Sequence, residues 1–522
     1  MVAIKRSCPM TSRRSKPESK PQSQPRSQSE PKPANRAGSP NQPATSNRAA
    51  LATVFLVVMI DLLGFGIVLP LLPFYAKEFA ATPLTIGLLY SVYSFMQLIF
   101  SPFWGGLSDR IGRRPIMLLS TFGASMAYLL FGFAETLGVL FLSRILAGGM
   151  GGNISTAQAY IADVTTKEDR ARGMGLIGAA FGIGFVIGPA SATLMIHPAF
   201  HGFIGSLGAE QLAVWMSDHR FALPGFFASF LSLCSFLMVM LKLPETVAVP
   251  RGAGLGEVIG LGIGAKTGDV EGAGTGESNG DVEGAGIGES TGISEGADAG
   301  TDTGDRPGTR ASARAGVFTL RFWRRLLDTT ETSNGIPLLL LLMIAFFLLS
   351  FGESSLYSAF PLFASELLNL TAEQVGVQFF FIGIIAVIIQ GFLIKPLTNR
   401  FPEERIFMVG NGLMVIGLAV IPLAGSMTQL AVALSVMAIG KSLNTPTMTS
   451  LISQQADESD VGAVMGTAQG LSGLGRMIGP SWGGAMFAIA YAIPFVATAA
   501  IVSGTIWIGY RLVRASAKSA TA

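Results

Sequence analysis

The stretch GGLSDRIGRRP, from Gly105 to Pro115, is the most specific signal in the sequence. It is polar and basic, and it separates two apolar stretches near residues 84–104 and 116–134. Each of these is long enough to cross about 30 Å of hydrocarbon as a helix. The stretch therefore predicts a short charged loop between two membrane-spanning helices.

The residue types in this loop each have a physical use. Gly105 permits a close helix crossing, Asp109 can face a neighbouring helix end or an arginine, and Gly112 lets the chain turn. Basic side chains can reach lipid phosphates or acidic residues. We expect a charge-assisted latch that holds one conformation, because charges that only set the topology would require neither Asp109 nor the glycines. The basic residues of the loop are Arg110, Arg113 and Arg114.

Long apolar stretches continue along the chain. Half of the 522 residues are apolar and 13% are charged, whereas ordinary soluble domains carry about 25% charge. We predict an all-α membrane protein with twelve transmembrane helices in two pseudo-symmetric six-helix halves. The first six apolar stretches lie near 51–75, 84–104, 116–134, 138–162, 173–195 and 222–243, and the second six near 335–358, 373–394, 405–424, 428–450, 462–488 and 493–511.

Polar segments flank and separate the two halves. The N-terminal tail is rich in Ser, Pro and basic residues, and the central segment is dominated by Gly, Ala, Glu, Asp and Thr. Neither composition offsets the entropy of folding. We predict a disordered N-terminal tail at 1–47, an N-terminal half at 48–246, a disordered Gly-rich cytoplasmic linker at 247–332, a C-terminal half at 333–512 and a cytoplasmic tail at 513–522.

The orientation follows from basic residues in short loops, which stay on the cytoplasmic side during insertion. In a chain of twelve spans the basic loops all fall on one side, and the opposite loops hold little beyond Lys77 and Arg220. We expect an integral protein of the plasma (inner) membrane with both termini cytoplasmic. The basic residues used are Arg110, Arg113, Arg114, Lys167, Arg170, Arg172, Lys395, Arg400, Arg405, Arg511 and Arg514.

The two halves are related in sequence. Residues 160–189 align without gaps over residues 451–480, and four glycines and a proline coincide: Gly175, Gly182, Gly184, Gly188 and Pro189 lie over Gly466, Gly473, Gly475, Gly479 and Pro480. Two related halves side by side are the parallel-repeat architecture of many secondary transporters, with the substrate near the midplane between them. The repeat therefore predicts a central binding cavity.

A glycine-proline motif marks the fifth span. Gly184 and Gly188 are four residues apart, a spacing that lets two helices approach closely, and Pro189 removes a backbone hydrogen bond. A hinge or tight pivot is one interpretation, and general helix packing is the other.

These motifs carry a family resemblance. The loop at 105–115 resembles the signature loop of the major facilitator superfamily, and Ser91 to Ser120 with Ala159 to Gly175 look like bacterial tetracycline/proton antiporters. The fifth-span motif resembles that of antiporters, although Ala192-Thr193 stands where a glycine pair is usual. The resemblance covers the first five spans and the end of the sixth, and fades across the second half as far as the eleventh. It implies drug-type antiport and not a particular cargo.

Five ionisable residues fall well inside predicted spans, where charge is costly and by default functional. Burial disfavours a charged carboxylate and a nearby cation favours it, opposing pressures that suit a group that takes up and loses a proton. Protonation would weaken a pairing with a cation as the halves rock; which carboxylate acts stays open, and buried ion pairing is the alternative. Arg144 resembles the fourth-span arginine of such antiporters. The five are Asp61, Arg144, Glu353, Lys441 and Arg476.

Polar amides inside spans are candidates for lining the cavity, although helix-helix hydrogen bonds explain them equally well. They include Gln97, Asn153, Gln158 and Asn444. No nucleotide-binding loop, metal-ligand cluster or nucleophile-base arrangement stands out, so we expect no cofactor, no metal and no enzymatic activity. The expected partners are a small-molecule substrate, protons and membrane lipid, with no nucleic acid, and the protein is expected to act as a monomer.

The features together predict a secondary active transporter that exports drug-like or amphipathic molecules in exchange for protons by alternating access. One alternative is a facilitator or proton symporter that imports a nutrient or organic anion. Another is a membrane scaffold or sensor that transports nothing.

Overall fold

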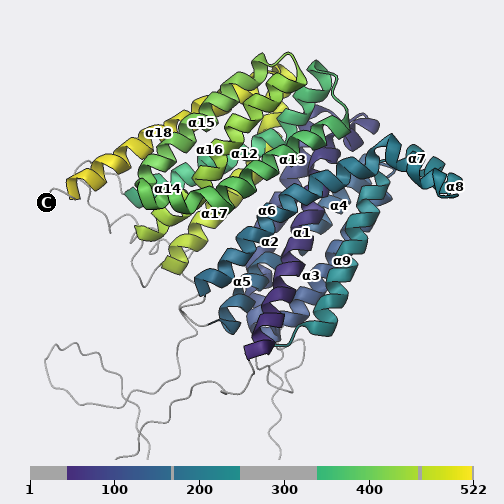
Figure 1. The fold of residues 1–522 in the computed structure, drawn as a ribbon, viewed down its shortest axis with the longest axis horizontal. Coiled ribbons are helices and arrows are strands. Elements are labelled where there is room, and N and C mark those ends of the chain that lie inside the picture. Colours follow the sequence, from purple (N-terminus) through teal and green to yellow (C-terminus); the bar gives the residue numbers. More distant parts are fainter. Residues whose placement is uncertain (1–43, 166–169, 247–337, 456–460, 520–522) are drawn as a thin grey trace, which may run out of the picture. The chain divides into compact units, whose positions relative to one another are not determined.

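The computed structural model describes residues 44–165, 170–246, 338–455 and 461–519, which are almost entirely helical and within which no strand occurs (Figure 1). The predicted tail at 1–47 and linker at 247–332 lie outside the described residues except at their edges, as does the end of the tail at 513–522. The predicted all-α class with twelve spans is confirmed.

The N-terminal half supplies the first six spans. Its fourth span is broken in the middle, so that it consists of two helices. The helices of this half are α1 (Ala44–Glu78), α2 (Pro83–Ile111), α3 (Arg113–Gly132), α4 (Leu137–Met150), α5 (Asn153–Val164), α6 (Arg170–Ile196) and α9 (Ala222–Lys242). Two short helices that the sequence did not predict, α7 (Pro198–Ser206) and α8 (Glu210–Asp218), connect α6 to α9.

The C-terminal half supplies the other six spans. Its eighth span contains a π-helical turn, and its ninth ends in a 3₁₀ turn. The elements are α12 (Leu338–Leu367), α13 (Ala372–Ile388), η2 (Ile389–Leu393), α14 (Ile394–Arg400), α15 (Glu403–Val420), η3 (Ile421–Leu423), α16 (Met427–Gln454), α17 (Val461–Ile489) and α18 (Ile493–Ser519).

Among the described residues, ten helical segments are long and apolar enough to cross a membrane by themselves. Helices α16 and α17 are as long, at 28 and 29 residues, but they are rich in Gly, Ser and Thr and hold Lys441 and Arg476. Such helices avoid lipid by packing against other helices, because small residues allow close approach and polar groups find partners there.

The turns between spans repeat from one half to the other. Ala80 and Asn369, after α1 and α12, both have left-handed backbones, with φ of 53° and 51°. Two residues later, Thr82 and Thr371 cap the next helices through their side chains. We call the end of the bundle with these two turns the turn face, and the end with residues 105–115 the motif face. The matching turns are structural evidence for the internal repeat.

The two halves touch near the turn face. Lys77 Nζ of α1 lies 2.9 Å from Glu366 Oε1 of α12, and Ser481 N of α17 donates to Ser91 Oγ of α2 at 3.1 Å. A Cβ on Gly87 of α2 would collide with the backbone of α17. Toward the motif face the same two helices have space, because a Cβ on four of their glycines at that end would meet nothing within 4 Å. These glycines are Gly105, Gly106, Gly466 and Gly470.

Glycines also set the packing inside each half. A Cβ on Gly184 or Gly188 of α6 would lie 2.8 Å from α1, at Leu62 and Gly66 respectively. Their counterparts Gly475 and Gly479 of α17 press on α12 in the same way. The predicted close helix approach at Gly184 and Gly188 is therefore present, and it is made with α1.

Candidate functional site

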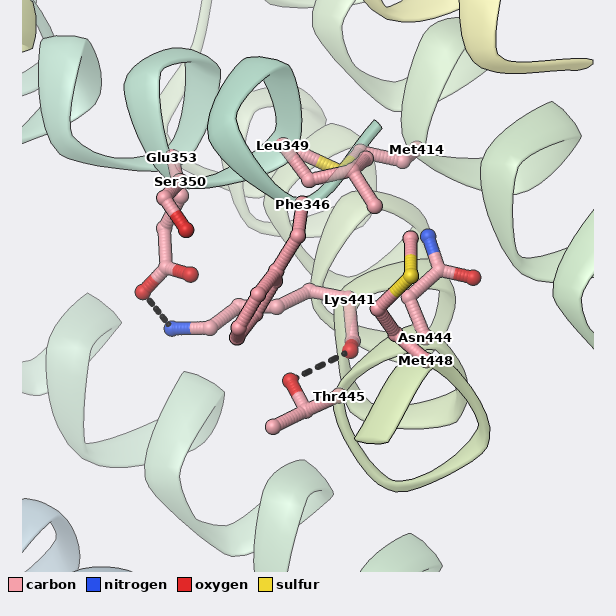
Figure 2. Close-up of a pocket in the computed structure, with 9 residues that line it drawn as sticks. All are labelled: Phe346, Leu349, Ser350, Glu353, Met414, Lys441, Asn444, Thr445 and Met448. Atoms are coloured by element: carbon pink, nitrogen blue, oxygen red, sulfur yellow. Dashed lines mark hydrogen bonds and ion pairs between the residues drawn. The ribbon is translucent and has the colours of Figure 1, made fainter. Parts of the chain in front are cut away.

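An ion pair joins α12 to α16 within the C-terminal half (Figure 2). Glu353 Oε1 accepts from Lys441 Nζ, and it also accepts from Tyr357 Oη at 2.9 Å. The Glu353 and Lys441 side chains are 28% and 27% exposed, so the pair is only partly buried. Lys441 and Tyr357 donate to the same carboxylate oxygen of Glu353.

A small cavity adjoins this pair between α12, α15 and α16. Its volume is about 30 Å³, which holds a water molecule or two and no organic cargo. Its wall combines apolar and polar groups, and Figure 2 shows the side chains of Glu353 and Lys441 meeting at one end. The lining residues are Phe346, Leu349, Ser350, Glu353, Met414, Lys441, Asn444, Thr445 and Met448.

The break in the fourth span shapes the other half of the site. The chain leaves the helix at Gly151-Gly152, and the carbonyls freed near the break accept hydrogen bonds from Trp104 Nε1 (to Gly149, 2.6 Å) and Ser120 Oγ (to Met150). Side chains that replace the lost helical bonds are an established cause of such breaks. The new helix α5 begins at Asn153, whose amide becomes the polar neighbour of Asp61 on α1.

Asp61 itself is half-buried and has no ion-pair partner among the described residues. Its contact with Asn153 does not reach the geometry of a well-formed hydrogen bond, and both polar atoms of that amide are buried without another partner. The sequence left open which of the two carboxylates, Asp61 or Glu353, pairs with which of the three intramembrane cations. Among these five residues, the structure pairs Glu353 with Lys441.

Arg144 is 2% exposed and lies among aromatic rings. Its guanidinium carbon is 4.9 Å from the Phe131 ring centroid and 6.0 Å from that of Tyr128. Its Nε contacts Ser143 Oγ at 3.4 Å, and its Nη2 is buried without a hydrogen-bond partner. Ring faces offset part of the cost of burying this cation, and the orphaned N–H group leaves it able to accept an anionic partner.

Aromatic rings connect the two halves of the site. The ring centroid of Phe65 of α1 lies 5.2 Å from that of Tyr93 and 5.9 Å from that of Phe185 of α6. Lys441 Nζ lies 6.0 Å from the Phe185 ring centroid. A second bridge, closer to the turn face, places Tyr90 of α2 6.2 Å from Tyr357. The Glu353–Lys441 pair thus contacts the N-terminal half through Phe185.

Arg476 lies on α17 at the interface between the two halves, which we call the seam. Its Nη1 donates to Ser472 Oγ at 2.8 Å, and Ser472 is hydrogen-bonded to Ser350 of α12 at 2.7 Å. Arg476 forms no ion pair with another described residue, and its side chain is only half-buried. The seam therefore holds a cation whose charge no carboxylate of the described chain neutralises.

The predicted amides separate into different environments. Asn444 donates to Asn411 Oδ1 at 2.7 Å and joins α16 to α15, although it also lines the small cavity. Gln97 is half-buried beside Gly151, and Gln158 is exposed. Asn153 is the amide that meets an ionisable residue of the site.

The loop at 105–115 forms a compact charge network within the N-terminal half. Arg113 binds Asp109 at 2.7 Å, Asp163 at 3.0 Å and Ser108 at 2.7 Å. The predicted contact of loop arginine with acidic residues is thus present. A close crossing at Gly105 is not: a Cβ there meets nothing within 4 Å, and α2 makes its close crossing at Gly87 near the turn face.

Glu245 is a functional residue that the sequence did not single out. Its two oxygens accept from the backbone N–H groups of Arg113 and Arg114, at 2.9 and 3.0 Å, and so cap the start of α3. Gly112 has a φ of 106°, and any Cβ there would collide with this carboxylate. Thr246 donates to Asp163 at 3.1 Å and joins both carboxylates in one network. The signal was an acidic residue directly after the sixth span.

Comparisons with known proteins agree with this architecture. The family model of the Major Facilitator Superfamily matches residues 54–393 and 342–522. The class B tetracycline resistance protein of Escherichia coli is 37% identical over 193 residues, 36% of this chain and 43% of that protein. The chain therefore matches less than half the length of that relative. The class C protein of Escherichia coli is 25% identical over 462 residues, 88% of this chain and 93% of that protein.

Two solved structures share the fold. The human organic anion transporter MFSD10 (TETRAN) superimposes with a TM-score of 0.57 at 22% identity, covering 90% of this chain and all of that one. A bacterial homolog of the human lysosomal transporter Spinster, in an inward-facing and occupied conformation, superimposes with a TM-score of 0.61 at 13% identity, covering 91% and 98%.

Proposed function

The chain belongs to the Major Facilitator Superfamily, and we propose that it exports amphipathic, drug-like small molecules across a membrane in exchange for protons. The observation that carries this proposal lies at the seam between the halves, where Lys441, paired with Glu353, is 6.0 Å from the Phe185 ring of the other half. Charged groups inside membrane spans mark substrate and ion pathways. Aromatic rings beside them offer an apolar surface to an amphipathic cargo.

Glu353 is our candidate for the proton site. A proton on this carboxylate removes its attraction for Lys441 and replaces two accepted hydrogen bonds by one donor. Lys441 lies against Phe185 of the other half, so its release changes a contact across the seam. A ligand shifts the equilibrium between two conformations only if it binds one of them more tightly. A proton that weakens a contact between the halves meets this condition, because the contact differs between the two conformations.

We propose that residues 48–246 and 333–512 are the two bodies that rock against each other. Contacts between the halves run from the turn face to the middle of the spans, where a Cβ on Gly383 of α13 would lie 2.7 Å from the Phe185 carbonyl oxygen of α6, and four glycines of α2 and α17 toward the motif face have space. With both termini cytoplasmic, as the basic loops favour, this arrangement corresponds to an inward-facing state. The proposed site is the plasma (inner) membrane, and the proposed functional unit is a monomer, because each chain holds both halves.

The test is flux into everted vesicles with a panel of fluorescent amphipathic dyes, with and without an inward-acidic pH gradient. Everted vesicles expose the cytoplasmic side, so an exporter should accumulate dye only when the gradient is present. Vesicles with the Glu353→Gln variant serve as the matched control. Equal dye uptake with and without the gradient, at normal protein levels, would refute proton-driven export.

One observation favours a second candidate, proton symport of an organic anion. The five ionisable residues singled out inside the spans comprise three cations, Arg144, Lys441 and Arg476, and two carboxylates, Asp61 and Glu353. A protonated Glu353 would leave Lys441 without a partner, and an anion on Lys441 would restore the neutrality that burial demands. The proton and the anion would then bind together. Uptake of an anionic dye into right-side-out vesicles, stimulated by external acid, would favour this reading over antiport.

A further inference from the structure

Helices α7 and α8 form a hairpin at the turn face, between the spans α6 and α9, and Figure 1 shows them extending beyond the bundle. Each carries apolar or aromatic residues at positions i, i+3, i+4 and i+7, which places them along one side of a helix. In α7 and its C-cap these are Phe200, Phe203, Ile204 and Leu207; in α8 and its C-cap they are Leu212, Trp215, Met216 and His219.

Several of these side chains have no protein cover. Phe203 is 58% exposed, Leu207 67%, Leu212 50% and Trp215 37%, whereas Met216 of the same stripe is buried. Several large exposed apolar side chains on one short hairpin mark contact with an apolar medium or partner, because a single exposed apolar residue is common but a group of them is not.

The hairpin is held in a defined position against the spans. His201 is buried and bridges the end of α6 to α8, with Nε2 2.7 Å from the Met195 carbonyl oxygen and Nδ1 3.3 Å from Ser217 Oγ. Trp215 stacks on Phe226 of α9, with ring centroids 6.0 Å apart. The exposed stripe is thus fixed relative to the membrane-spanning helices.

The covering medium follows from where the hairpin is attached. Both its ends continue directly into spans that carry exposed apolar side chains of their own, such as Leu194 of α6 at 58% and Phe230 of α9 at 60% exposed. The hairpin is therefore attached where two membrane spans end, which places its exposed apolar side chains at the membrane boundary. Residues 197–220 contain two acidic residues, one arginine and no lysine, so attraction to anionic headgroups is not the driving force.

We propose that the α7–α8 hairpin lies in the headgroup and acyl boundary of the leaflet at the turn face, with Phe203, Leu207 and Leu212 inserted among the lipids. Amphipathic helices with aromatic and aliphatic residues on one side bind in this way. The hairpin anchors the ends of α6 and α9 at a constant depth. The inference does not depend on the proposed cargo or on proton coupling.

Spin labels test the position of the stripe without any transport assay. The chain has two cysteines, Cys8 and Cys234, and replacing both by Ser gives a background for single labels. Labels at Leu207→Cys and Phe203→Cys probe the stripe, and labels at Gly202→Cys and at Glu210→Cys are matched controls on the sides of α7 and α8 away from it. The protein is reconstituted in vesicles of zwitterionic phosphatidylcholine, and collisions with oxygen and with a water-soluble nickel chelate are measured.

Lipid insertion predicts that labels at 203 and 207 collide severalfold more with oxygen than with the chelate, and that labels at 202 and 210 show the reverse. Adding Leu212→Glu to the 207 label should reduce the oxygen preference, because a carboxylate opposes insertion. Chelate access that is equal at all four positions would overturn the proposal. So would shielding from both reagents at 203 and 207, which indicates a protein partner or a second copy on the stripe.

Discussion

In the proposed cycle, a proton on Glu353 competes with the Lys441 ammonium group and the Tyr357 phenol for one carboxylate. Glu353→Gln keeps the size of the side chain but cannot take up the proton. We expect gradient-driven dye accumulation to fall about tenfold or more, equivalent to at least about 1.4 kcal/mol in coupling, while exchange of dye between equal pools persists. Vesicle uptake and counterflow are the two measurements. Full gradient-driven transport by Glu353→Gln would assign the proton to another group, with Asp61 next in line.

Glu245 acts on the backbone, where its carboxylate replaces a helix cap. We expect Glu245→Ala to lower the free energy of unfolding by about 1 kcal/mol, the usual worth of a helix cap, because it leaves two N–H groups at the start of α3 without acceptors. Glu245→Gln retains one acceptor oxygen and should lose less. Thermal unfolding of the purified variants measures the difference. Equal midpoints for wild type and Glu245→Ala would mean that water replaces the cap at no cost.

Among the helices, α6 and α1 pack closely because the glycines at their contact have no side chains. A methyl group at Gly188 would lie 2.8 Å from the backbone of Gly66, so the helices must separate to admit it. We expect Gly188→Ala to cost about 1–3 kcal/mol of stability and to slow transport. Gly178→Ala on the same helix is the matched control, since a Cβ there meets nothing within 4 Å. Thermal unfolding in detergent checks both, and similar losses for the two variants would contradict tight packing at Gly188.

The helices were predictable from the sequence where one local property decides them. Long apolar stretches predict the spans, and the four-residue spacing of Gly184 and Gly188 predicts a close helix contact. Helices α7 and α8 were not predicted because a helix of nine residues is too short to be recognised as a membrane span and is easily taken for a loop. The capping role of Glu245 was not predicted because its hydrogen-bond partner Arg113 lies 132 positions away along the chain. The sequence named Asp61 and Glu353 as carboxylates and three cations as possible partners, but which of them meet depends on how the helices pack, which no local pattern reveals.

In the whole molecule, Lys77 joins the halves at the turn face through Glu366 and through Ser365 Oγ at 2.8 Å. The pair must separate if that face opens. We expect Lys77→Glu to favour opening and to change the balance of inward and outward states by a few-fold, a modest shift because exposed pairs contribute only about 0.2–1 kcal/mol. The charge swap Lys77→Glu with Glu366→Lys should restore the wild-type balance. Cysteine accessibility at the seam measures it, and a swap that behaves like the single variant would show that the pair does not close this face.

The central claim is that two homologous halves rock about a shared cavity, and paired spin-label distances test it most directly. In the Cys8→Ser, Cys234→Ser background, one label pair at Lys242 and Arg400 spans the motif face, and another at Glu135 and Gly425 spans the turn face. Distances are measured by pulsed electron resonance at neutral and acidic pH, with and without a transported dye. The account predicts that one distance lengthens as the other shortens. Two distances that change in the same sense, or that stay constant while the labelled protein transports, would contradict it.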